Sequence, residues 1–353
     1  MLNIVGRLNP DRFAPAVCVL SKGSSLETEI EHMGFPLIEG PFVVPPQPLY
    51  TLPYRVWKAA QVFRPYKFKI WHSFHWSSDY TEPLIARMAG AQAWIYTKKN
   101  MNWDRRAWRI RSLFASRIVA RNKTMMDRFF ANHWYRFKTN LVPGGVDTNR
   151  FSPDVPPRLG LRNRFGIKSS EIVVACVAQL VRVKGHPTLL DAIAQIDGLH
   201  LWIAGKTVDE GYAQELDHLA KELGIANRVF FLGQVSDVSA LLAETDIFVL
   251  PTWSRWEHEE GCPVALLEAM AAGKCCIATD VAGSRDLIED KVNGILVKPE
   301  NSKEMAKALR NLTTSPEKIL KFGVETRKRI QTEFTLEKEV SSMQAIYEEV
   351  LES

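Results

Sequence analysis

Short apolar runs alternate with amphipathic segments along the second half of the chain. Apolar runs at residues 171–181, 199–205, 228–233, 246–251 and 274–280 predict buried strands, because strands covered on both faces are apolar throughout. Between them, segments such as HPTLLDAIAQI and GYAQELDHLAKELGI repeat apolar residues with the period of a helix. Strands that alternate with helices in this order predict an α/β fold with a parallel, doubly wound sheet.

The first half repeats this order more weakly. PAVCVLS, FPLIEG, FKIWHSF, AWIYTKK and SRIVARN predict strands, with helical segments between them. The segment NLVPGGVDTNRFSPDVPP, residues 140–157, is rich in Pro, Gly, Asn and Asp, which indicates a domain boundary. We therefore expect two α/β domains that face a cleft, with ligands bound at the carboxyl ends of the strands.

The composition of the 353 residues, 46% hydrophobic and 24% charged, is that of a globular protein and argues against a disordered chain. No apolar run approaches the roughly 18 residues that span a bilayer. The start MLNIVGRLNPDRF lacks the apolar core of a signal peptide. The five cysteines have no metal-ligand spacing, so we expect reduced thiols in a cytoplasmic protein.

Basic residues are concentrated in the first domain. Residues 1–140 carry 21 Lys and Arg against 9 Asp and Glu, and residues 141–353 carry 24 against 31, so the net charges are +12 and −7. Residues 98–138 alone hold 12 basic and 2 acidic residues, interleaved with aromatic residues. This pattern favours peripheral contact with the anionic inner face of a membrane. A solvated helix face over an ordinary core is the alternative, and nucleic acid is not an expected partner.

Two carboxylates stand eight residues apart in EEGCPVALLEAMAAG, residues 259–273. Pro263 suits the first turn of a helix, whose free N–H groups and dipole form a site for a diphosphate. Glu268 lies about one and a half turns further along, where its carboxylate can accept hydrogen bonds from a ribose diol. Glu260, in the preceding loop, can hold sugar hydroxyls or stabilise positive charge at an anomeric carbon. An acidic loop followed by one exposed glutamate is the plainer alternative.

Lys184 and Gly185 stand between a predicted core strand, which ends near Ala178, and the next helix. A lysine at the carboxyl end of such a strand can neutralise a diphosphate leaving group as a point charge. A lone lysine after a strand is commonly just solvated. Its coincidence with the glutamate pair is what favours one shared site.

These motifs together resemble the retaining GT-B glycosyltransferases, and within them the large family 4, glycosyl transferases group 1. VAQLVRVKGHPTLLDAI resembles the family's strand, phosphate lysine and helix, and FFLGQVSDVSALLAETDIFVLPT its base-binding loop and following strand. EEGCPVALLEAMAAGKCCIATDVAGSRDLIEDKVNGILVKP resembles the signature block with its E-x7-E pair. LVPGGVDTNRFSP is similar to the interdomain segment, and FTLEKEVSSMQAIYEEVL to the last helix, which in this family crosses back to the first domain.

The resemblance implies two Rossmann-like domains: an acceptor-side domain at residues 1–145, a nucleotide-sugar donor domain at 146–333 and a crossing helix at 334–353. It implies an NDP-sugar as co-substrate, no metal or other cofactor, and a glycan-precursor or lipid-linked acceptor. Transfer would retain the anomeric configuration, by front-face attack with the leaving phosphate as base. The donor-binding residues it implies are Gln179, Arg182, Lys184, Gly205, Gly233, Val235, Glu260, Gly261, Cys262, Pro263, Val264 and Glu268.

The catalytic residues expected from the same resemblance are Glu260, Lys184, His75 and His72. The two histidines follow the strand FKIW, where they can orient or deprotonate an acceptor hydroxyl. A pair of core or surface histidines is the alternative interpretation.

The sequence departs from the family pattern in three places. Gln179 stands where the family usually has an arginine, so Lys184 and the helix N-terminus must supply more charge, with Arg182 as a nearby substitute. MLNIVGRLNPDRFAPAVCVLS resembles the end of the first helix and the second strand, so we expect the first domain to lack its first strand and Gly-rich loop. Lys98 and Lys99 stand where many members carry a histidine.

Two other functions compete with sugar transfer. A non-catalytic nucleotide-sugar-binding relative would keep the donor domain but lack turnover, which Gln179 and the incomplete first domain favour. A dinucleotide-dependent oxidoreductase would need G-x-G-x-x-G after a strand, and the sequence contains no such motif. The sequence leaves the donor base, the sugar and the acceptor open.

Overall fold

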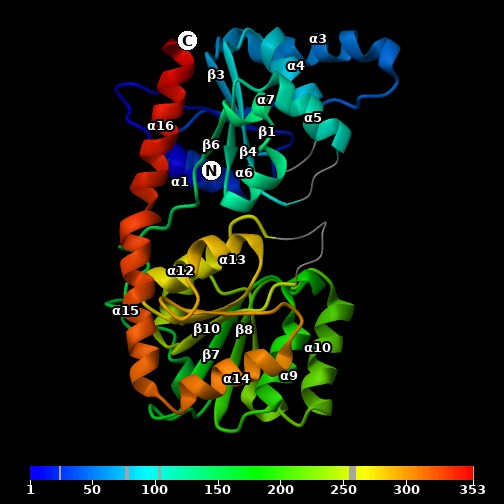
Figure 1. The fold of residues 1–353 in the computed structure, drawn as a ribbon. Coiled ribbons are helices and arrows are strands. Elements are labelled where there is room, and N and C mark those ends of the chain that lie inside the picture. The colour runs from blue at the N-terminus through cyan, green and yellow to red at the C-terminus, as the bar shows by residue number, and fades with distance from the viewer. Residues whose placement is uncertain (24, 76–78, 102–104, 254–259, 353) are drawn as a thin grey trace. The chain divides into compact units, whose positions relative to one another are not determined.

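The chain folds into two compact units, each built on parallel strands (Figure 1). The computed structural model describes residues 1–23, 25–75, 79–101, 105–253 and 260–352. Unit 1 comprises residues 1–143 and 336–353, and unit 2 comprises residues 144–335. The predicted domain limits, 145/146 and 333/334, lie two residues from these points.

Unit 2 contains a six-stranded parallel sheet with the order β12-β11-β10-β7-β8-β9. Its strands are β7 (Ile172–Val177), β8 (Leu199–Ala204), β9 (Val229–Gly233), β10 (Ile247–Leu250), β11 (Cys275–Thr279) and β12 (Ile295–Val297). The chain builds β7, β8 and β9 outward on one side, then returns to place β10 on the other side of β7. The strand order therefore reverses between β7 and β10, and the prediction of a doubly wound parallel sheet is confirmed.

Alternate side chains of the central strands enter two different cores. Ile247 and Val249 of β10 pack in one hydrophobic cluster, while Phe248 and Leu250 pack in the other. Because both faces are covered, these strands need apolar residues at every position, which explains the unbroken apolar runs. The helices of this unit are α8 (Leu161–Arg164), α9 (His186–Ala194), α10 (Glu210–Glu222), α11 (Val238–Ala243), α12 (Val264–Ala271), α13 (Ala282–Leu287), α14 (Ser302–Thr313) and α15 (Pro316–Glu333). Short 3₁₀ turns, η3 (Arg182–Lys184) and η4 (Ala226–Arg228), follow β7 and precede β9.

Unit 1 holds two separate parallel sheets. A two-stranded sheet pairs β1 (Val17–Val19) with β2 (Leu37–Glu39), and a four-stranded sheet has the order β3 (Ile70–Ser73), β4 (Ala93–Lys98), β5 (Arg117–Ala120), β6 (Thr139–Leu141). Its helices are α1 (Leu2–Val5), α2 (Ser25–His32), α3 (Leu52–Phe63), α4 (Thr81–Met88), α5 (Arg105–Phe114), α6 (Lys123–Phe129), α7 (His133–Arg136) and α16 (Leu336–Glu352), with 3₁₀ turns η1 (Leu49–Thr51) and η2 (Arg64–Tyr66).

The last helix, α16, belongs to unit 1 by its contacts (Figure 1). Arg121 after β5 pairs with the buried Glu339 at 2.5 Å, and Arg117 of β5 pairs with Glu349 at 2.6 Å. The Tyr347 hydroxyl lies 2.6 Å from Nδ1 of His72 in β3. These polar contacts fix α16 over the sheet, and its apolar face packs with β4, β5 and α1.

Two strands and one helix boundary differ from the sequence-based expectation. The three-residue strands β6 and β12 were not predicted, because three residues are too few to show the alternation or apolar run that indicates a strand. Leu141 of the predicted linker lies in β6, which the edge of β5 holds in register. Pro263 is the cap residue before α12 rather than a residue of its first turn.

We expect Tyr347→Phe to lower the free energy of unfolding by roughly 1–2 kcal/mol, because it removes the hydroxyl partner of a buried histidine nitrogen. Urea unfolding followed by circular dichroism measures this loss. Tyr50→Phe is the matched control, since Tyr50 is 86% exposed. Equal stability of the two variants would contradict a role for this hydrogen bond in holding α16.

Candidate functional site

Lys184 and Glu260 meet at the point where the strand order of unit 2 reverses. Lys184 ends the turn η3 after β7, and Glu260 follows β10, the neighbour of β7. The Lys184 Nζ lies 2.8 Å from Oε2 of Glu260, and each side chain is about one-fifth exposed, at 20% and 21%. Crevices at such reversal points, outside the carboxyl ends of the strands, are the usual ligand sites of open α/β sheets.

A glycine explains how the two loops come so close. Gly185 has φ 69°, and a Cβ on it would lie 2.0 Å from the carbonyl oxygen of Pro251, at the end of β10. No other residue type fits this approach, because the added carbon would overlap a backbone atom. The Trp253 N–H donates to the Val183 carbonyl at 2.8 Å, which fastens the turn η3 to the segment after β10.

Three further predicted donor-binding residues lie side by side at the ends of β7, β8 and β9. Gly205 follows β8, and a Cβ there would lie 1.9 Å from the carbonyl oxygen of Ala178. The Gly205 N–H donates to the Gly233 carbonyl at 2.7 Å. Gln179 next to Ala178 is exposed. The carboxyl ends of β7, β8 and β9 thus lie next to one another, and Gly205 and Gly233 place no side chains there.

The helix α12 begins at Val264, which is 57% exposed, so its N-terminus opens to solvent. The first N–H groups of a helix have no partner within the helix and carry its positive dipole end. Glu268, in the second turn of this helix, is half-buried, and burial raises the pKa of its carboxyl to about 7. Arg150 is the opposing charge that lowers this pKa. Glu268 is therefore a carboxyl group that titrates near neutral pH.

The other predicted donor-binding residues, Arg182, Val235, Gly261 and Cys262, differ in their contacts and burial. Arg182 donates to Glu215 at 2.7 Å on the exposed side of α10, so its guanidinium has a partner in the structure. Val235 packs partly buried against a core cluster, and Cys262 against another. Gly261 is buried. The structure thus brings Lys184, Glu260 and the start of α12 together, and Arg182 pairs elsewhere.

Sequence reasoning missed two residues that position Glu260. The Thr252 hydroxyl lies 3.3 Å from the Oε2 of Glu260 that also contacts Lys184. Gly283 in α13 donates its N–H to the Glu260 carbonyl at 3.2 Å, and a Cβ there would lie 2.8 Å from that oxygen. The position of Thr252 directly after a predicted strand was the available signal for the first. Gly283 had none, because its contact joins the helix α13 to a loop more than 20 residues earlier in the chain.

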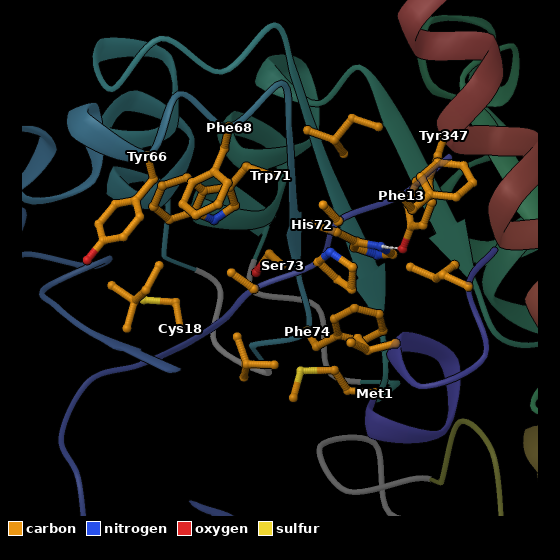
Figure 2. Close-up of a pocket in the computed structure, with 18 of the residues that line it drawn as sticks. Met1, Phe13, Cys18, Tyr66, Phe68, Trp71, His72, Ser73, Phe74 and Tyr347 are labelled. Carbon is orange, nitrogen blue, oxygen red and sulfur yellow. Dashed lines mark hydrogen bonds between the residues drawn. The ribbon is translucent and has the colours of Figure 1, made fainter. Parts of the chain in front are cut away.

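His72 and His75, the two predicted acceptor residues, line a cavity of about 980 Å³ beside β3, and Figure 2 shows His72 within it. His72 uses both ring nitrogens, with Tyr347 at 2.6 Å and Thr97 at 2.8 Å. Burial lowers the pKa of His72 to about 3, so the ring is neutral at physiological pH. Burial also lowers the pKa of His75, whose ring meets Phe42 edge-on. His72 thus links β3 to α16 and β4 through its two ring nitrogens, and an acceptor role for either histidine stays a prediction.

In the described parts of the chain, no group of three His, Cys, Asp or Glu side chains is arranged to hold a metal ion. All five cysteines are free thiols, of which Cys176, Cys275 and Cys276 are buried. Burial raises the pKa of Cys176 and Cys275 to about 12, which suits inert packing groups.

Comparison with known proteins agrees with this geometry. Residues 159–329 match the family model described as glycosyl transferases group 1. A putative glycosyltransferase EpsD of Bacillus subtilis (strain 168) is 33% identical over 216 residues, 60% of this chain and 54% of that protein. The GDP-mannose-dependent alpha-(1-6)-phosphatidylinositol monomannoside mannosyltransferase of Mycobacterium tuberculosis (strain CDC 1551 / Oshkosh) is 31% identical over 201 residues, 55% of this chain and 51% of that protein. The chain spans about half the length of these relatives.

Solved structures share the fold over nearly the full chain. A glycosyltransferase from Rickettsia africae ESF-5 superposes with a TM-score of 0.88 at 17% identity, covering 99% of this chain and 93% of that one. Anabaena Alr3699/HepE, solved in complex with UDP and glucose, gives a TM-score of 0.82 at 20% identity over 99% and 94% of the two chains. The two parallel units are thus those of the GT-B fold, and residues 159–329 of this chain are similar to the glycosyl transferases group 1.

Proposed function

We propose that the protein is a retaining, metal-independent hexosyltransferase of family 4, which moves a sugar from an NDP-sugar to a lipid-linked or polysaccharide-precursor acceptor of the cell envelope. The observation that carries this proposal is the Lys184–Glu260 pair beside the N-terminus of α12, where the strand order reverses. One cation, one carboxylate and a set of backbone N–H groups are the groups that a sugar diphosphate needs.

The proposed donor occupies the edge formed by the strand ends. Its diphosphate lies against the N-terminus of α12 and draws Lys184 away from Glu260, because two phosphate charges attract the ammonium more than one carboxylate does. Released from Lys184, Glu260 faces the sugar, where Thr252 and Gly283 keep it in place. Glu268 accepts hydrogen bonds from the ribose hydroxyls.

The chemical step needs charge stabilisation and positioning from the protein. The bond between the anomeric carbon and the phosphate oxygen breaks, and the acceptor oxygen bonds to the same face of that carbon. The proton of the acceptor hydroxyl passes to the departing phosphate oxygen. Lys184 and the dipole of α12 stabilise the negative charge that grows on the diphosphate.

Names of related proteins support a nucleotide-sugar donor but differ in the base. The mycobacterial relative is named as GDP-mannose-dependent, and the cyanobacterial structure holds UDP and glucose. Gly233 and Val235, in the loop expected to contact the base, leave the choice open. A panel of UDP-, GDP-, ADP- and dTDP-sugars is therefore the direct route to the donor.

The acceptor side of the proposal includes contact with the anionic cytoplasmic face of a membrane through exposed parts of residues 98–138. Leu113 at the end of α5, and Trp134 and Phe137 at α7, are 61–70% exposed and stand among basic residues. Exposed aromatic and basic side chains suit a lipid surface. No helix in the described residues has the length and apolarity needed to cross a bilayer.

Part of the basic segment has a different role from the one expected. Lys98, Arg111 and Lys138 are buried, with exposed fractions of 0–8%. Lys98 lies 4.0 Å from the Trp108 ring centroid, and burial lowers the pKa of Lys98 to about 7. Arg111 pairs with the buried Glu82 at 2.8 Å, and Lys138 donates to two backbone carbonyls at 3.0 Å. These three cations support the interior of unit 1, so the proposed membrane contact rests on the exposed residues alone.

We expect Glu260→Ala to lower kcat of sugar transfer by roughly 10²–10³-fold, the usual loss for one group that stabilises transition-state charge. Lys184→Ala should weaken donor binding as well, because it removes the cation that contacts the diphosphate. Transfer of radiolabelled sugar to membrane extracts and calorimetric binding measure the two effects. Glu317→Ala, an exposed carboxylate in α15 of the same unit, is the control. Undiminished transfer by Glu260→Ala would contradict the proposal, and donor binding without transfer by the unaltered protein would favour the non-catalytic relative.

Donor affinity should rise as the pH increases from 6 to 8. The pKa of Glu268 is raised to about 7 in the folded protein, so the carboxylate that accepts ribose hydrogen bonds is populated only above that pH. The phosphates of a nucleotide sugar are diesters and do not titrate in this range. Calorimetric titration with the active NDP-sugar at pH 6, 7 and 8 tests this expectation. In Glu268→Gln the affinity should be lower at pH 8 and nearly independent of pH; an unchanged pH dependence in this variant would assign it to another group.

The same raised pKa has a consequence for stability. Ionised Glu268 is disfavoured by burial, so the folded protein carries a penalty that is absent below pH 4.5, grows up to pH 7 and is constant above it. We expect Glu268→Gln to raise the free energy of unfolding at pH 8 by about 1–3 kcal/mol and to have a much smaller effect at pH 5. Urea unfolding of unit 2 at the two pH values measures the difference.

Reversal of two exposed charges, Arg109→Glu with Arg136→Glu, should weaken binding to vesicles of anionic lipid by at least about tenfold, given about 1 kcal/mol per basic residue near the surface. Cosedimentation at low and moderate salt measures this. Lys307→Glu with Lys318→Glu, equally exposed in unit 2, is the matched control. Equal losses in both double variants would indicate a nonspecific charge effect rather than a surface on unit 1.

A further inference from the structure

Positive charge at the proposed donor site is largely cancelled by paired carboxylates. Lys184 pairs with Glu260 at 2.8 Å, and Arg182 pairs with Glu215 at 2.7 Å. Each of these pairs has no net charge, whereas a nucleotide sugar brings a negative charge on each of its phosphates. A diphosphate bound at the carboxyl ends of the strands is therefore better balanced when a further cation lies there.

Lys206, the second residue after β8, supplies such a cation. Its side chain is exposed, and among the described residues it takes part in no ion pair and no side-chain hydrogen bond. Asp209, in the same loop, is engaged as the cap of α10, where it accepts the Tyr212 N–H at 3.2 Å. Lys206 thus presents an unpaired ammonium group beside the edge on which the donor is proposed to lie.

The strand register places Lys206 opposite Gln179. The last residues of β7 and β8 pair with each other, and three residues further along each segment Leu180 and Thr207 form an isolated parallel bridge. Both pairs have the same offset, so Gln179 and Lys206 stand at paired positions. The Leu180 N–H donates to the Lys206 carbonyl at 3.0 Å, which extends the pairing beyond the two strands. Backbone hydrogen bonding therefore sets the position of Lys206.

Lys206 lies on the face of the sheet that α12 covers. Val177, the last residue of β7, packs against the cluster that contains α12 and against the cluster that contains Ala204. Side chains alternate between the two faces of a sheet, so residues two positions further along return to the same face. Gln179 and Lys206 are those residues. The cation is therefore on the same side of the sheet as the unpaired N–H groups of α12.

The strand order indicates which phosphate Lys206 can reach. β8 lies between β7 and β9 in the sheet, and two strand spacings, about 10 Å, separate β7 from β9. In the proposed function the sugar and its phosphate lie at Lys184 and Glu260, beside β7 and β10, while the base lies in the loop after β9. The phosphate bonded to the nucleoside then lies near the end of β8, within reach of the flexible four-carbon stem of a lysine.

We propose that Lys206 binds the phosphate that carries the nucleoside, while Lys184 serves the phosphate that carries the sugar. This inference rests on the proposed transfer from an NDP-sugar. When the sugar leaves, negative charge grows on the phosphate that carried it, and the charge of the other phosphate does not change. Lys206 therefore contacts the donor equally in the ground state and the transition state, and such a contact contributes to affinity and not to the chemical step.

Calorimetric titration with UDP, GDP, ADP and dTDP, and with the four corresponding nucleoside monophosphates, tests this division of roles. A monophosphate contains only the phosphate assigned to Lys206. We expect Lys206→Ala to weaken binding of both the monophosphate and the diphosphate at least about tenfold, as for loss of a hydrogen bond to a charged group. Lys184→Ala should weaken mainly the diphosphate. In sugar transfer, Lys206→Ala should raise KM and leave kcat within about twofold of its original value.

Matched variants separate a local contact from a general charge effect. Lys168→Ala removes an exposed lysine just before β7, at the opposite edge of the sheet, and should leave both affinities unchanged. Lys206→Arg should keep them. Gln179→Arg combined with Lys206→Ala should restore most of the loss, because it moves the charge to the paired position. Equal melting temperatures of all variants show that the fold is intact.

The outcomes distinguish this inference from the proposed function. Nucleotide affinities unchanged by Lys206→Ala would overturn the inference and leave the proposed function standing. A loss confined to diphosphates, or an equal loss in Lys168→Ala, would also contradict it, because the first assigns Lys206 to the other phosphate and the second indicates a nonspecific effect. If no nucleotide binds the unaltered protein, the inference and the proposed function are both wrong.

Discussion

The close approach of two loops at Gly185 is the constraint on which the site of unit 2 depends. Parallel pairing of β7 with β10 sets their carboxyl ends next to each other, but only a residue without a side chain lets the turn after β7 lie against the Pro251 carbonyl. This contact brings Lys184 within 2.8 Å of Glu260, although 76 positions separate them in the chain. Gly283 likewise allows a close backbone approach, here to the carbonyl oxygen of Glu260. The charge pair is thus fixed by backbone geometry.

Unit 1 is organised around buried polar groups. Glu82 accepts hydrogen bonds from Trp71 at 3.1 Å and Ser73 at 2.7 Å and pairs with Arg111, all in the interior. A buried ion pair of this kind contributes little net stability, yet loss of one partner is expensive because the other stays charged and unpaired. Trp71, Ser73 and Glu82 also line the cavity of unit 1.

The two units differ in how their described strands are arranged, and this bears on function. In unit 2 the described strands form one sheet whose reversal point carries the paired lysine and glutamate. In unit 1 the described strands form two separate sheets. His72 of β3 is hydrogen-bonded to Tyr347 of α16. Donor binding in the proposed reaction therefore relies on Lys184 and Glu260, which are already in contact. Acceptor binding would rely on the part of unit 1 that surrounds the cavity beside β3.

The sequence by itself determined the α/β class and the order of most strands, because apolar runs are local properties of the chain. Its short motifs also predicted one site with Lys184, Glu260 and Glu268, of which the structure brings Lys184 and Glu260 into contact. Only the tertiary structure decided that Thr252 and Gly283 hold Glu260, that Arg182 pairs with Glu215, and that part of the basic segment is interior. Each of these depends on which distant segments meet, since burial and pairing arise from contacts between segments, and no local period or spacing records them.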